Sequence, residues 1–207
     1  MGTGRVILGV LALLALATAA RAQERLVLGP YPGGPWREVV NQSKGLAFVI
    51  EQLPVGQTPE NFHDVITAQS IPGFQGTPAA FISRAFVQYG ADCETVETRG
   101  PTIDVEQERA VAYGQFYCGR QKGEAYGVHI FFKAILGNNG LYVVDRDFRT
   151  QPSPHASVPA FDNSKDAIAF MEAEGVATRY LKEQVYLCDP LFPDPRCAAA
   201  TAAAPGK

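Results

Sequence analysis

The sequence lacks an excess of basic residues. Its 207 residues hold 18 Lys and Arg against 21 Asp and Glu, a formal net charge of −3. A nucleic-acid-binding protein needs a basic surface to meet the phosphates, so this composition disfavours that class. The hydrophobic fraction of 46% and the charged fraction of 19% are ordinary for globular proteins, which argues against disorder, collagen or coiled coil as the main class. The length suits one domain.

The sequence also lacks an apolar run of the roughly 20 residues that a membrane-spanning helix needs. Residues 1–22 instead have the pattern of a signal peptide, with Arg5 in the positive segment, an apolar segment over 6–17 and the cleavage pattern Ala20-Arg21-Ala22. The alternative, an uncleaved anchor, is disfavoured by that short run. The first cysteine is Cys93, so none near the cleavage site can carry a lipid. We therefore expect a periplasmic or secreted protein that is cleaved before Gln23, is not a lipoprotein and has no membrane span after cleavage.

Cysteines are few, and their even number is informative. Four cysteines in an exported chain predict two disulfide bonds, for which three pairings are possible. Pairing nearest neighbours in sequence favours Cys93–Cys118 and Cys188–Cys197. A zinc site would need clustered cysteines or histidines, and none of the three histidines lies near a cysteine. The sequence predicts no metal and no other cofactor.

Short segments of β-rich sequence separated by turn residues dominate the chain, which predicts an antiparallel sheet. Gly137-Asn138-Asn139-Gly140 is a strong hairpin turn. Along the strand before it, Tyr126, Val128 and Ile130 share one face, and the opposite face, with His129, is expected to be half covered. The strands are predicted at 36–41, 46–53, 65–71, 95–98, 110–118, 125–136 and 141–148.

Helix signals are fewer. Thr77-Pro78 begins the clearest helix, which we expect to end with a left-handed Gly90. Thr58-Pro59 is typical of a second, short helix start. A last helix is expected to begin at Asn163 or Ser164, to bury Ile168 and Met171, and to be interrupted at Gly175. The domain prediction is a signal peptide at 1–22, an irregular leader at 23–35, a single α+β domain at 36–197 and a disordered Ala-rich tail at 198–207.

One stretch carries a resemblance. The segment Leu53-Pro54-x-Gly56-Gln57-Thr58-x-Glu60-Asn61-Phe62, followed by Ile66-Thr67-Ala68-Gln69, resembles exported proteobacterial proteins of unknown role that share the pattern P-x-G-E/Q-T-x-E-N-W…T-V-Q. Phe62 stands where that pattern has Trp. More distantly, the order of elements is similar to the PsbP-like and DcrB-like sandwiches, in which helices pack on an antiparallel sheet. The resemblance implies that fold for residues 36–197 and carries no catalytic residues. Turn and capping chemistry alone also explains the segment as scaffold.

Catalytic patterns are nearly absent. No G-x-S-x-G motif is present, and cysteines held in disulfides cannot act as nucleophiles. His129 and His63 are weak candidates for a catalytic base, and for His129 a structural role at the sheet surface is the favoured alternative. Asp145-Arg146-Asp147 places both acids on one face of a strand; the interpretations are a Ca²⁺ site or, better, solvated charges at a sheet edge.

The remaining candidate for a binding site is an aromatic strand face. Tyr113, Tyr117, His129 and Phe131, with Gln115, would form a ligand groove if the covering helices leave one end open; the alternative is that a helix packs there. The sequence therefore favours an exported, non-catalytic envelope protein that binds another envelope protein or a small apolar ligand. The alternatives are a secreted hydrolase that uses His129 or His63, and a structural accessory of an envelope complex.

Overall fold

The computed structural model describes residues 24–189 and 195–197. Groups of strands alternate with two long helices along the chain. The elements are β1 (Arg25–Leu28), β2 (Trp36–Lys44), β3 (Ala47–Pro54), β4 (Asp64–Pro72), α1 (Pro78–Gly90), β5 (Val96–Glu106), β6 (Arg109–Cys118), β7 (Gly127–Leu136), β8 (Gly140–Thr150), α2 (Ser164–Glu183) and β9 (Val185–Cys188).

Seven of these strands form one antiparallel sheet in the order β2-β3-β4-β8-β7-β6-β5. Strands β5 to β8 are consecutive, as the sequence predicts, and the turn between β7 and β8 is closed by a hydrogen bond from the Gly137 amide to the Gly140 carbonyl (2.8 Å). Because β4 pairs with β8, strand β8 lies in the middle of the sheet while β2 and β5 form its edges.

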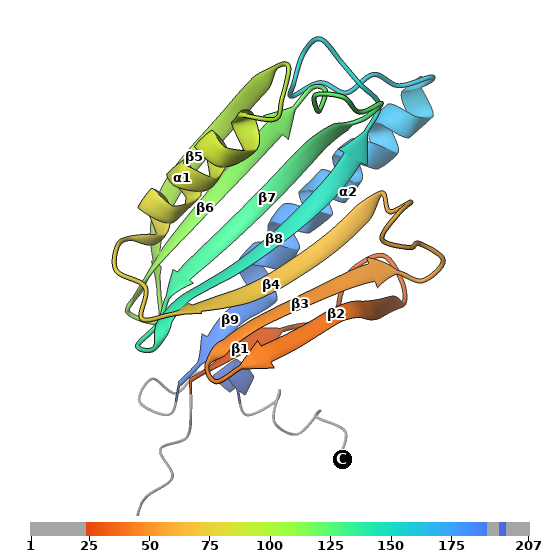
Figure 1. Cartoon of the computed structure of the whole chain (residues 1–207). Helices are drawn as coiled ribbons and strands as arrows, with labels where there is room; N and C mark the ends of the chain where they lie inside the picture. Colours follow the sequence, from red (N-terminus) through yellow and green to blue (C-terminus); the bar gives the residue numbers. More distant parts are fainter. Residues whose placement is uncertain (1–23, 190–194, 198–207) are drawn as a thin grey trace, which may run out of the picture.

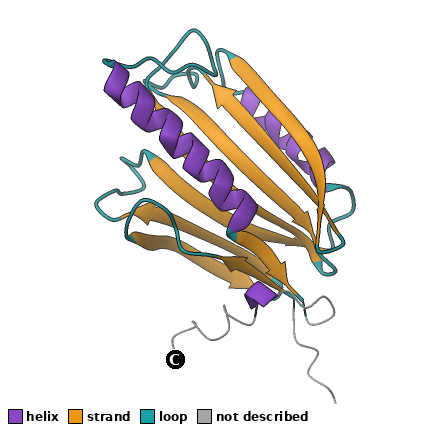
Figure 2. Cartoon of the chain, turned by 180° about the vertical axis from the view of Figure 1, so that it is seen from behind, coloured by secondary structure: helices purple, strands orange, loops and turns teal. Residues whose placement is uncertain are grey.

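One helix packs on each face of the sheet (Figure 1; Figure 2). Helix α1 covers β5, β6 and β7, and beneath it lie Ile130 and Phe132 of β7. Helix α2 crosses the opposite face, where Phe131 and Ile135 of the same strand are buried with Tyr180 of the helix. The fold is therefore α+β, an antiparallel sheet with helices packed on it, which confirms the predicted class.

A second, two-stranded sheet joins the two ends of the described chain. Strand β1 pairs with β9, so part of the stretch that the sequence suggested was an irregular leader is a strand. A buried ion network fixes this sheet to the seven-stranded one, because Arg109 at the start of β6 forms salt bridges with Glu24 (2.6 Å) and Asp189. Asn138, in the β7–β8 turn, hydrogen-bonds both acids.

Both predicted disulfides, Cys93–Cys118 and Cys188–Cys197, are present. They indicate an oxidising, extracytoplasmic location, because such bonds rarely persist in a reducing cytosol. Neither helix within residues 24–189 and 195–197 combines the length and apolar character needed to cross a membrane. The predicted signal peptide and Ala-rich tail lie outside the described residues.

Four details of the helix predictions are wrong. Helix α2 runs through Gly175 without a break, and Ile168 and Met171 are 53% and 59% exposed because the helix turns a different face, with Phe170 and Ala173, toward the sheet. Helix α1 does begin at the Thr77 cap, yet it ends at Ala91 in a right-handed conformation. The segment after Thr58 forms a turn, since Asn61 accepts the Thr58 amide (2.7 Å) before the chain enters β4.

Candidate functional site

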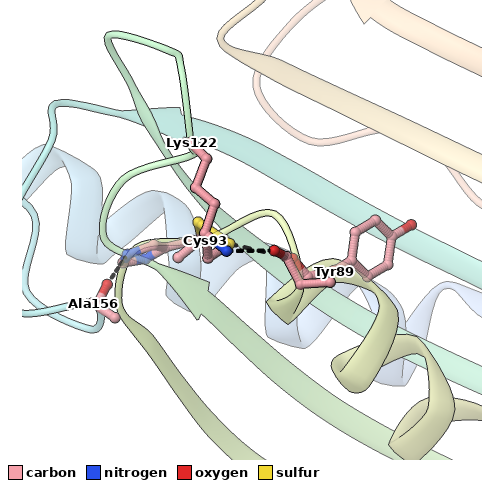
Figure 3. The surroundings of a disulfide bond; sticks show 7 residues. Tyr89, Cys93, Lys122 and Ala156 are labelled. Carbon is pink, nitrogen blue, oxygen red and sulfur yellow. Dashed lines mark hydrogen bonds between the residues drawn. A yellow bond between two sulfur atoms is a disulfide. The ribbon is translucent and has the colours of Figure 1, made fainter.

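A pocket of about 190 Å³ opens on the α1 side of the sheet, beside the Cys93–Cys118 disulfide. We call it the disulfide pocket. Figure 3 shows its disulfide end, where Cys93 lies next to Tyr89 at the end of α1, with its disulfide-bonded Sγ 3.3 Å from the Tyr89 carbonyl oxygen. Its lining residues are Phe62, Tyr89, Asp92, Cys93, Phe116, Cys118, Gln121, Tyr126, Val128, Ile130, Asp147 and Arg149.

The walls of this pocket are mostly apolar. Tyr89 leans from α1 over the sheet, with its ring 5.8 Å from that of Phe116 and 6.0 Å from that of Phe132. Val128 and Ile130 follow one another at the two-residue spacing of a strand face, so both side chains lie on the α1 side of β7. Apolar walls with a few polar groups are the usual composition of a small-molecule site.

Arg149 is the cation of the disulfide pocket. Its guanidinium lies over the ring of Phe62 (3.8 Å) and over the ring of Tyr126 (4.4 Å). Its Nη1 donates a 3.3 Å hydrogen bond to the Glu60 carbonyl, while its buried Nε has no hydrogen-bond partner. Among the ion pairs within the described chain, none involves Arg149.

The loop that presents Phe62 to Arg149 lies within residues 53–69. Gln57 Oε1 accepts hydrogen bonds from the amides of His63 (2.6 Å) and Asp64 (3.2 Å), which fixes the loop against the start of β4. The segment therefore has the turn chemistry that the scaffold interpretation predicts, and it also forms part of a pocket wall.

Two aspartates of β8 lie beside the disulfide pocket. Asp145 and Asp147 face the α1 side, since the residues on either side of the pair, Val144 and Phe148, pack in the core under α2. The carboxyl groups of the two aspartates hydrogen-bond to each other, and Asp145 also bonds Thr67 of β4. Ionised carboxylates are acceptors only, so this contact requires a proton between them.

Burial is the main cause of the altered acidity of this pair. It raises the pKa of Asp145 to about 7, against hydrogen bonds from Asp147 and Thr67 that act in the opposite direction. It also raises the pKa of Asp147 well above the ordinary range, and the neighbouring charge of Asp145 adds to this. The pair therefore retains a proton at neutral pH.

This arrangement corrects one prediction. The sequence correctly places Asp145 and Asp147 on one face, but they are not solvated charges at a sheet edge: β8 is central and Asp145 is 5% exposed. Arg146, on the other face, forms a salt bridge with Asp64 (2.6 Å). No group of three or more metal-binding side chains within residues 24–189 and 195–197 is arranged to hold a metal ion.

The predicted aromatic groove lies on the α2 side of the sheet. Tyr113, Gln115 and Phe131 line a second pocket of about 190 Å³ between β5, β6 and α2. Tyr117 and His129 are not part of its lining; they are buried in the neighbouring, closed region, where the His129 ring lies edge-on to Tyr117 (4.6 Å). Gln115 already accepts the Tyr117 hydroxyl (2.7 Å), and the cation of this pocket, Arg99, is exposed and lies over the Tyr117 ring (5.2 Å).

Neither candidate histidine has the surroundings that a catalytic base needs. His129 is 1% exposed, and its ring nitrogens contact Glu174 Oε1 (2.6 Å) and the Ala156 carbonyl (2.8 Å), so neither nitrogen is available to a substrate. The face that carries His129 is fully covered at this point, not half covered. His63 is exposed in the loop before β4, and its ring makes no hydrogen bond to a described residue.

Sequence reasoning did not single out Arg149 or the proton held by Asp145 and Asp147. The available signal was the two-residue spacing, which places Asp145, Asp147 and Arg149 on one face of a single strand. The same spacing correctly grouped Tyr126, Val128 and Ile130, all of which line the disulfide pocket.

Comparison with known proteins adds no family: no protein-family model matches the chain, and no curated protein is similar enough to it to count as a relative.

Proposed function

We propose that this protein is an exported, non-catalytic binding module whose disulfide pocket takes a small ligand with an apolar group. The observation that carries the proposal is the combination of aromatic walls with the guanidinium of Arg149, which lines the pocket with one long hydrogen bond (3.3 Å) and no ion pair in the described chain. Polar groups in proteins are nearly always hydrogen-bonded, so the N–H donors that this guanidinium has to spare mark a place where a ligand atom belongs.

The size of the pocket limits the ligand. A cavity of about 150 Å³ holds a benzene ring. The disulfide pocket, at about 190 Å³, therefore has room for one ring or branched chain together with a few further atoms. Export is supported by the two disulfides, and the resemblance to PsbP-like and DcrB-like sandwiches is supported by the layered arrangement of helices on the sheet.

Binding of three related probes tests the function. Phenylacetate, phenylacetamide and phenethylamine share one ring but carry an anionic, a neutral and a cationic group. Saturation-transfer NMR on the oxidised chain is expected to detect binding of at least one of them.

Two variants locate the site. Val128→Phe places a ring inside the disulfide pocket and is expected to abolish the signal. Thr178→Phe places the same ring at the pocket on the α2 side and is expected to leave it unchanged. No binding of any probe, or binding that survives Val128→Phe and is lost in Thr178→Phe, would refute the proposal.

A further inference from the structure

Arg149 has more hydrogen-bonding capacity than the chain uses. A guanidinium carries five N–H donors in a fixed plane. Of the acceptors in the described chain, only the Glu60 carbonyl takes one, at the long distance of 3.3 Å. The Nε–H is buried and donates to nothing.

The two aromatic rings determine where an acceptor can approach. Phe62 and Tyr126 lie against the guanidinium at 3.8 and 4.4 Å from its central carbon, a cation–π arrangement that covers the faces of the plane. Acceptors must therefore approach at the edge of the plane, in the direction in which N–H bonds point. A carboxylate is the group that fits such an edge, since its two oxygens match the spacing of two parallel N–H donors.

The neighbouring acids do not exclude an anion. The Asp145–Asp147 pair holds a proton, so it carries less negative charge than two carboxylates would and repels an anion less. The lining of the disulfide pocket contains one further acid, Asp92, which is exposed at the end of α1. Solvent screening weakens its effect on a ligand at Arg149.

We propose that the ligand is a small monocarboxylic acid, whose carboxylate pairs with Arg149 and whose ring or branched chain lies against Tyr89, Val128 and Ile130. This inference rests on the proposed function and adds the chemical class of the ligand to it. The class follows from the stacked, incompletely bonded guanidinium, and the apolar part follows from the walls and the volume of about 190 Å³.

Isothermal titration calorimetry on the full, oxidised chain tests the inference. Phenylacetate is expected to bind about tenfold to a hundredfold more tightly than phenylacetamide, because a charged hydrogen-bonded pair contributes about 1.5–3 kcal/mol. Arg149→Gln is expected to remove that preference while it leaves the weak affinity for the amide unchanged. Arg149→Lys keeps the charge but loses the planar fork, so an intermediate preference is expected.

Arg84→Gln is the matched control, because Arg84 also lies over a ring, that of Phe74 (5.7 Å), but is exposed on α1. It is expected to leave both affinities unchanged. If phenylacetamide or phenethylamine binds as tightly as phenylacetate to the wild-type chain, the carboxylate assignment is wrong while the binding function stands. If none of the three binds, the proposed function itself fails. The comparison of probes needs no variant, so it holds even if Arg149→Gln does not fold.

Discussion

Replacement of Asp145 by Asn is expected to stabilise the protein above neutral pH. The fold raises the pKa of Asp145 from 3.8 to about 7, chiefly by burial. A carboxyl whose folded-state pKa lies above its unfolded value contributes its full stability below about pH 4, and that contribution is lost as the pH rises toward 7. Since one pKa unit corresponds to about 1.4 kcal/mol, the loss amounts to about 4 kcal/mol.

Asparagine keeps the shape of the side chain and an oxygen for Thr67, but it cannot ionise. About 1 kcal/mol is lost with the altered hydrogen bonds, so Asp145→Asn is expected to raise the free energy of unfolding by about 3 kcal/mol at pH 8.5. At pH 4, where Asp145 of the folded wild-type chain is protonated and therefore neutral like asparagine, the variant should differ little from wild type or be slightly less stable.

Urea unfolding of the oxidised chain at the two pH values measures this difference, with the fluorescence of Trp36, the single tryptophan, and circular dichroism as probes. Asp104→Asn is the matched control, since Asp104 is exposed on β5 and should change stability by less than about 0.5 kcal/mol at either pH. Equal destabilisation by Asp145→Asn at pH 4 and pH 8.5 would mean that the fold does not raise the pKa of Asp145, and the prediction would be refuted.

Two further predictions concern the small sheet and the disulfides. Arg109→Ala leaves two buried carboxylates without their cation and is expected to cost about 3–5 kcal/mol of unfolding free energy, measured by urea titration; a cost below 1 kcal/mol would contradict the buried network. Peptide mapping without reduction is expected to recover Cys93–Cys118 and Cys188–Cys197 as the linked pairs, whereas any peptide that joins the two pairs would overturn the pairing.

Local signals in the sequence predicted most of the sheet, because its central part is a meander of neighbouring strands. The alternation along β7, the turn at Gly137 and the cysteine pairing are all properties of short stretches of chain, and each is confirmed. The pairing of β1 with β9 joins residues about 160 positions apart, and neither four-residue strand carries a pattern strong enough to identify it alone.

The exposed residues of α2 show a different limit. Ile168 and Met171 have the spacing of a buried helix face, and the sequence therefore predicts that they pack on the sheet. A periodic pattern identifies which side chains share a face, but it does not indicate which face meets the sheet. The helix instead packs Phe170, Ala173 and Ala177 against the core.

The same limit explains why the polar part of the disulfide pocket was missed. Asp145 and Asp147 were assigned to an edge because two acids in a strand usually lie where water reaches them. Their position depends on β4, which pairs with β8 and turns a meander edge into the centre of the sheet; Asp145 pairs with Thr67, 78 residues earlier in the chain. Once β4 is in place, the two carboxyls cannot both stay ionised, and Arg149, two residues further on, is carried between Phe62 and Tyr126. The long-range pairing thus creates both the shared proton and the incompletely bonded cation, and no short stretch of the sequence contains either.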